Sequence, residues 1–252
     1  MNIIILITLF FLLGLIFGSF YNVVGLRLPK NIPFANDRSV CPQCNNQLTW
    51  YENIPLVSFL IQRGKCRHCG ESISYIYPVI EFLTGALFAF SFYSIGFQAE
   101  LITALLFVSM LMIIVVSDIT YMLIPNKVLL FFLPLFIGMR IIEPSDPWWS
   151  AIGGAMIGFG LIFMIILISR GGMGAGDMKL FGVLGIVLGM EKVLLAFFLS
   201  CLIGAVIGMV LILFKIIERK QPVPFGPYIV VAALITYFYG NTLINWYFNL
   251  LV

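Results

Sequence analysis

The chain has 252 residues, of which 62% are hydrophobic and only 10% are charged, and its net charge is +3. A soluble domain is typically about 45–50% apolar and about 25% charged, so this composition excludes an ordinary soluble protein. The large apolar fraction also excludes an intrinsically disordered chain. The small net charge gives no basis for a nucleic-acid partner. The composition therefore predicts an all-α polytopic protein whose surroundings are the lipid bilayer.

Eight apolar runs approach the length of about 20 residues that a membrane-spanning helix requires. The first run has no basic residue before it and no small-residue cleavage site after it, so we interpret it as a retained helix and not as a cleaved signal peptide. The sixth run is short and follows a glycine-rich stretch. The eight runs cover residues 3–24, 78–97, 101–117, 126–142, 150–169, 178–190, 193–214 and 227–248.

The only long polar segment lies between the first two runs. We therefore expect three parts, which are a first transmembrane helix (1–24), a loop domain (25–77) and a transmembrane core (78–252). Loops on the cytoplasmic side of a membrane carry an excess of Lys and Arg. Of the 14 cations, Arg140 and Lys192 fall on one predicted side, which predicts that the other side is cytoplasmic and that both termini lie outside. The remaining cations are Arg27, Lys30, Arg38, Arg63, Lys65, Arg67, Lys127, Arg170, Lys179, Lys215, Arg219 and Lys220.

The loop domain contains two C-x-x-C pairs, Cys41–Cys44 and Cys66–Cys69. Two such pairs at this separation are typical of a zinc site with four thiolate ligands, which is closed and therefore structural. Disulfides are disfavoured because the cytoplasm is reducing, and a redox-active dithiol is the main alternative. The residues that follow the pairs, Asn45 and Gly70, tolerate the left-handed backbone of a metal-binding turn. We interpret His68 as a loop residue and not as a ligand.

Two aspartates, Asp118 and Asp177, stand at the ends of apolar runs on the same predicted side. A carboxylate near the hydrocarbon region is energetically costly, so each is a candidate functional residue. Two adjacent carboxyl groups can share a proton, and then one activates water while the other polarises a carbonyl group. Gly174 and Gly176 would allow an extended substrate backbone to approach Asp177. The alternative is structural, with Asp177 as a helix cap and Asp118 at the start of a turn.

The positions of five other side chains, relative to the apolar runs and the loop domain, predict their surroundings. Lys179 and Glu81 are further candidates for the approach of a substrate, and Glu81 could also pair with a cation. Glu52 and Glu71 are predicted to be solvated loop charges, and Cys201 a small buried residue of an apolar helix. These five side chains lie outside the two C-x-x-C pairs and the two aspartates.

Six segments in this order together resemble the type IV prepilin leader peptidases, a family of membrane aspartyl proteases. They extend over most of the chain, so the resemblance does not depend on one short motif. The segments are GSFYNVVGLRLP (18–29), WYENIPLVSFL (50–60), GKCRHCGESISYIYPVIE (64–81), SDITYMLIPN (117–126), GMGAGDMKL (172–180) and PFGPYI (224–229).

The resemblance implies that Asp118 and Asp177 are the catalytic pair of an enzyme in the bacterial inner membrane. It implies prepilin or pseudopilin substrates that carry a short basic leader, a glycine before the cut and an apolar helix after it. Because all four loop cysteines are present, it also implies N-methylation of the new N-terminus with S-adenosylmethionine, although no residue pattern locates the methyl donor. An ion-coupled transporter and a membrane-anchored redox module are the alternatives from other classes. The pathway and the oligomeric state do not follow from the sequence.

Overall fold

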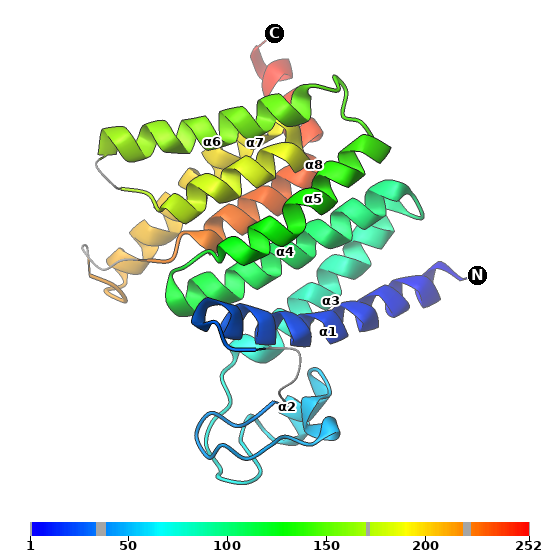
Figure 1. Ribbon diagram of the computed structural model, residues 1–252, viewed down its shortest axis with the longest axis vertical. Coiled ribbons are helices and arrows are strands. Elements are labelled where there is room, and N and C mark those ends of the chain that lie inside the picture. The colour runs from blue at the N-terminus through cyan, green and yellow to red at the C-terminus, as the bar shows by residue number, and fades with distance from the viewer. Residues whose placement is uncertain (1, 34–38, 170–171, 219–222, 252) are drawn as a thin grey trace. The chain divides into compact units, whose positions relative to one another are not determined.

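The computed structural model describes residues 2–33, 39–169, 172–218 and 223–251 (Figure 1). Four of the predicted cytoplasmic cations, Arg38, Arg170, Arg219 and Lys220, lie outside these ranges. The described residues form helices and no β-sheet, apart from two isolated β-bridges in the cysteine loop. The prediction of an all-α polytopic membrane protein is confirmed.

Within the described residues, six helices are long and apolar enough to cross a membrane, namely α1, α3, α4, α6, α7 and α8. Helix α5 coincides with the predicted run 126–142 but has only 17 residues. The helix bounds are α1 Ile3–Arg27, α2 Val57–Ile61, α3 Ile76–Ile95, α4 Ala99–Tyr121, α5 Asn126–Ile142, α6 Ser150–Ser169, α7 Ala175–Leu213 and α8 Gly226–Leu251, with short 3-10 helices at Leu28–Lys30 and Trp50–Asn53.

Helix α7 is two helices joined by a sharp break at Gly189, whose φ of 78° and ψ of −178° are not helical. The rings of Phe181 and Phe197 are 5.8 Å apart, whereas 16 residues of continuous helix would separate them by about 24 Å. The chain therefore folds back, and the first half (residues 175–188) packs against the second half (190–213). These halves correspond to the predicted runs 178–190 and 193–214, so the expectation of about eight helical spans is confirmed.

The break in α7 leaves backbone groups that need partners, because a helix end exposes unpaired carbonyl and N–H groups. The guanidinium of Arg140 on α5 donates hydrogen bonds to the carbonyl oxygens of Ile186 and Val187. After the break, the N–H of Met190 donates to Ser150 Oγ at 3.2 Å. Side chains from α5 and α6 thus stabilise the reversal of the chain.

The chain forms two compact units, Met1–Val116 and Ser117–Val252. In the first unit α1 packs along α3, with the rings of Phe10 and Phe92 stacked at 4.6 Å, and the cysteine loop extends beyond the ends of these helices (Figure 1). In the second unit α7 packs against α5, α6 and α8. The predicted division into parts 1–24, 25–77 and 78–252 stays a prediction.

Candidate active site

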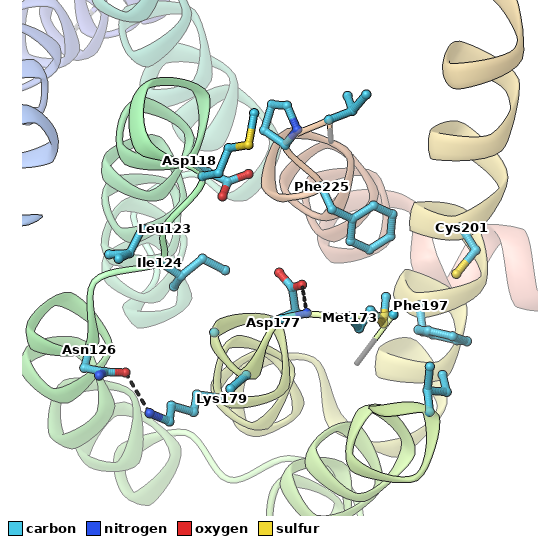
Figure 2. A pocket seen from close by; sticks show the side chains of 18 residues that line it. Asp118, Leu123, Ile124, Asn126, Met173, Asp177, Lys179, Phe197, Cys201 and Phe225 are labelled. Carbon is cyan, nitrogen blue, oxygen red and sulfur yellow. Dashed lines mark hydrogen bonds between the residues drawn. The ribbon is translucent and has the colours of Figure 1, made fainter. Parts of the chain in front are cut away.

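A cavity of about 930 Å³ lies in the second unit, and both Asp118 and Asp177 line it. The two carboxyl groups point toward each other across this cavity (Figure 2). The other lining residues come from the α4–α5 connection and the start of α5, from α6 and the connection to α7, from both halves of α7 and from the segment before α8. They are Met122, Leu123, Ile124, Asn126, Ile165, Gly172, Met173, Gly174, Ala175, Gly176, Lys179, Phe197, Cys201, Val223, Pro224 and Phe225.

Asp118 lies in the last turn of α4 and is 6% exposed. The apolar run ends at residue 117, but the helix continues to Tyr121, so Asp118 belongs to the helix and does not begin a turn. Its Oδ2 accepts a hydrogen bond of 2.7 Å from the backbone N–H of Gly226, the first residue of α8. A Cβ at position 226 would lie 2.6 Å from that oxygen, so the close approach requires glycine.

Asp177 is the third residue of α7, and its Oδ2 accepts a hydrogen bond of 3.1 Å from the backbone N–H of Gly174. Gly174 is the N-cap of α7, so Asp177 caps the helix from its third position and not as the N-cap of the structural alternative, and the same carboxyl group also faces the cavity (Figure 2). Each aspartate is thus bound to a backbone N–H at the start of a helix, Asp118 at α8 and Asp177 at α7. A helix N-terminus favours negative charge, so both positions are suited to carboxylates.

Three of the four residues assigned to substrate approach, Gly174, Gly176 and Lys179, line the cavity. The Lys179 ammonium donates a hydrogen bond of 3.0 Å to Asn126 Oδ1 on α5. Glu81 is not among the lining residues. It belongs to the first unit, is 8% exposed, and its Oε2 accepts a hydrogen bond of 2.8 Å from the backbone N–H of Leu56 in the cysteine loop.

Gly226, Phe225 and Phe197 were not among the predicted site residues, and Cys201 was predicted only as a small buried residue. Phe225, Phe197 and Cys201 nevertheless line the cavity, and Gly226 binds the Asp118 carboxylate. Cys201 is partly exposed where we predicted a buried residue, because the fold-back of α7 brings its second half to the cavity. The PFGPYI run was a signal for Gly226 and Phe225. No local pattern indicated Phe197 or Cys201.

The four loop cysteines form a separate cluster in the first unit, with their sulfur atoms all within 4.8 Å of one another. Each pair occupies the same kind of turn. In the first, Cys41 N–H donates to the Asn46 carbonyl at 3.0 Å, and in the second Cys66 N–H donates to the Glu71 carbonyl at 2.8 Å. The expected left-handed residues follow each pair, with φ of 54° at Asn45 and 74° at Gly70. All the cysteines are free thiols, so none forms a disulfide.

The pKa values of three of the four loop thiols are shifted, in opposite directions, by backbone hydrogen bonds, burial and neighbouring sulfur atoms. Backbone N–H groups of Cys44 and Gln43 lower the pKa of Cys41 to about 7, and those of Cys69 and His68 lower the pKa of Cys66. At Cys69 the hydrogen bond from Glu71 is outweighed by burial and by the neighbouring sulfurs, which raise its pKa to about 12. Four thiolates at this distance need a cation to be stable together. The cluster therefore has the donor set of a possible metal site.

The prediction that Glu52 is a solvated charge was wrong, since Glu52 is 7% exposed. It is the third residue of the short 3-10 helix Trp50–Asn53. There its Oε2 accepts hydrogen bonds from the backbone N–H of the N-cap Thr49 at 2.8 Å and from the Thr49 hydroxyl at 2.7 Å. His68 Nε2 lies 3.8 Å from Glu52 Oε1 and is not part of the thiol cluster. The prediction that Glu71 is solvated is confirmed.

Comparison with known proteins gives two family matches. The model of the bacterial peptidase A24 N-terminal domain matches residues 12–95, and that of the type IV leader peptidase family matches residues 105–209. A prepilin leader peptidase/N-methyltransferase from Bacillus subtilis (strain 168) is 43% identical over 97% of this chain and 99% of its own length. A protein of the same name from Aeromonas salmonicida (strain A449) is 33% identical over 96% of this chain and 94% of its own.

A third relative, again a prepilin leader peptidase/N-methyltransferase, comes from Xanthomonas campestris pv. campestris and is 34% identical over 93% of this chain and 92% of its own. No solved structure matches the chain. These relatives match nearly the whole sequence and nearly their own full length. The chain belongs to the type IV leader peptidase family.

Proposed function

We propose that this protein is a membrane aspartyl peptidase that removes the short basic leader of prepilin-like proteins and then N-methylates the new N-terminus. The observation that carries the peptidase assignment is the meeting of Asp118 and Asp177 at one cavity, with their carboxyl groups facing each other. The relatives named prepilin leader peptidase/N-methyltransferase support both activities.

The hydrogen bonds of Asp118 and Asp177 indicate which oxygen of each carboxyl group is available for the reaction. Oδ2 of each aspartate is bound by a backbone N–H, from Gly226 and from Gly174, so we assign Oδ1 of each to water and substrate. One ionised carboxylate takes a proton from water as the water oxygen attacks the scissile carbonyl carbon. The other carboxyl group donates its proton to the carbonyl oxygen. Collapse of the resulting diol breaks the C–N bond, and the amine leaves with a proton returned by the acids.

The distribution of charge supports a substrate that remains in the bilayer during cleavage. We place the cavity and the cysteine loop on the cytoplasmic side, and both termini outside, because twelve of the 14 cations are assigned to that side. A substrate with a cytoplasmic basic leader and an apolar helix then presents its scissile bond at this interface. The carboxylates attract the basic leader, and Gly174 and Gly176 leave room for the glycine before the cut.

We assign zinc to the four-thiol cluster. In tetrahedral coordination with bonds of about 2.3 Å, the sulfur atoms of a zinc site are about 3.8 Å apart, and Cys41 Sγ and Cys69 Sγ are 3.9 Å apart. Four ligands leave no open position, so the metal stabilises the loop and takes no part in hydrolysis. Both C-x-x-C pairs converge in one cluster, which favours a zinc site over a redox-active dithiol. S-adenosylmethionine would supply the methyl group, with no residue assigned to its binding.

The test is incubation of the purified protein with a prepilin, followed by mass spectrometry of the mature N-terminus with and without S-adenosylmethionine. We expect the mass of the cleaved pilin, plus one methyl group when the donor is present. Asp118→Asn and Asp177→Asn should each abolish cleavage while the protein still folds. An asparagine side chain keeps an oxygen that accepts the same backbone hydrogen bond, so these variants separate catalysis from capping. Cleavage by either folded variant would refute the assignment.

A further inference from the structure

A second hollow adjoins the catalytic cavity, on the other side of Lys179. It is an open groove of about 660 Å³ between α5, α6 and the first half of α7. Its floor contains the buried Leu129 and Val183, which are 5% and 6% exposed, and its rim contains Leu130 and Met156, which are 70% and 71% exposed. Apart from the polar residues at one end, the groove is apolar. Its lining residues are Asn126, Lys127, Leu129, Leu130, Leu133, Ala155, Met156, Phe159, Lys179, Gly182, Val183 and Ile186.

The groove is continuous with the catalytic cavity, because Asn126 and Lys179 line both. These two residues are joined by the hydrogen bond described above (Figure 2), so a bonded pair of side chains is shared by the two hollows. From Lys179 the groove extends along α7 to Ile186, which is about 10 Å of helix. It therefore begins beside the catalytic acids and leads away from them.

We propose that this groove binds the first two turns of the substrate's apolar helix, immediately after the scissile bond. The inference rests on the proposed peptidase function, which requires an apolar helix to lie beside the aspartates during cleavage. Charge fixes the direction of the substrate. Lys127, which lines the groove and not the cavity, repels a basic leader, whereas Asp118 and Asp177, which line the cavity and not the groove, attract it.

A glycine in the floor makes the groove suitable for a helix. Small residues allow two helices to approach closely in a membrane, where packing drives association. At Gly182 an added Cβ would make only ordinary contacts, the nearest at 3.6 Å with Phe159 Cβ. An added Cβ at position 182 therefore fits beside Phe159, and because Gly182 lines the groove, a longer side chain there should occupy part of it.

The experiment compares two substrates, a full-length prepilin and a soluble peptide that spans the cut but lacks the apolar helix. Gly182→Leu should reduce the ratio of kcat/KM for prepilin to kcat/KM for peptide at least tenfold, and Gly182→Ala should reduce it less. The matched control is Gly138→Leu on α5, which is also a glycine-to-leucine change in a helix, has no atoms within 4 Å of an added Cβ and lines neither hollow. It should keep the wild-type ratio.

A second measurement does not depend on the folding of Gly182→Leu. A photoreactive benzophenone amino acid at Leu130 or Met156 in the Asp177→Asn background should crosslink to prepilin. The same group at the exposed Leu213, far along α7, should not. Crosslinks to lipid alone, or a Gly182→Leu ratio equal to that of wild type, would overturn the proposal. Failure of the wild-type protein to cleave prepilin at all would instead refute the peptidase function itself.

Discussion

The contact between Gly226 and Asp118 makes a sharp prediction for the substitution Gly226→Ala. The added Cβ would lie 2.6 Å from Asp118 Oδ2 and 2.8 Å from its Cγ, whereas real Cβ atoms essentially never come within 3.0 Å of another atom. The carboxyl group must therefore retreat by about 0.4 Å or more. This movement also weakens the hydrogen bond of 2.7 Å that Gly226 donates to it.

The size of the effect follows from two general magnitudes. A misplacement of about 1 Å in a catalytic group can reduce the rate about 10²-fold, so a movement near half of that should reduce kcat roughly tenfold. Overpacking a buried site typically costs about 1–3 kcal/mol of stability. Because Gly226 contacts the acid and not the distant part of the substrate, we expect the loss mainly in kcat and little change in KM.

The assay is steady-state cleavage of prepilin in detergent or liposomes, with thermal unfolding of the same samples as the measure of folding. Gly208→Ala is the matched control, because an added Cβ there meets nothing within 4 Å. It should keep the wild-type kcat. If Gly226→Ala is as active as Gly208→Ala, then Asp118 is not held by this contact during catalysis and the reasoning fails.

Three further predictions concern stability and metal binding. Arg140→Met should lower the free energy of unfolding by about 2–3 kcal/mol, measured by thermal unfolding in detergent, because the two carbonyl groups before the break in α7 lose a charged donor. Cys41→Ser should reduce the zinc content measured by mass spectrometry, and acidification should release zinc from wild type because protons compete for thiolates. Hydrogen bonds from Thr49 hold the pKa of Glu52 below its ordinary value. The ionised Glu52 therefore contributes its full stabilisation of the folded protein at a pH above the ordinary pKa, and this contribution is lost as the pH falls through the lowered pKa of the folded state. The stability difference between wild type and Glu52→Gln should therefore shrink in acid, and a constant difference would contradict this.

The apolar runs predicted the helices well, because membrane length imposes a strong pattern on the sequence. The division of α7 into two helices was also predicted, since Glu191 and Lys192 interrupt the apolar residues between the runs 178–190 and 193–214. The left-handed turns after the two C-x-x-C pairs were also predictable, because each depends on a short motif, a C-x-x-C pair followed directly by Asn or Gly. Both features depend on residues that are near one another in the chain.

The environment of the site was harder to predict because it depends on residues far apart in the sequence. Asp118 and Gly226 are separated by 108 positions, and no spacing rule indicates that the start of α8 binds that carboxylate. The burial of Glu52 was missed because its charge suggested solvent and its capping role was not considered. The two aspartates were ambiguous as isolated residues, and the resemblance to a family supported them before the structure brought them together.

The shortness of the first half of α7 has a consequence for how deep the reaction takes place. Residues 175–188 form a helix about 21 Å long, whereas the hydrocarbon core of a bilayer is about 30 Å thick. This mismatch is relieved when the membrane thins locally or when the Asp177 end stops short of the headgroups. In both cases we expect the proposed catalytic acids to meet the substrate where its apolar helix begins. A prepilin can thus be cut without being lifted out of the lipid, and water comes to the peptide bond instead.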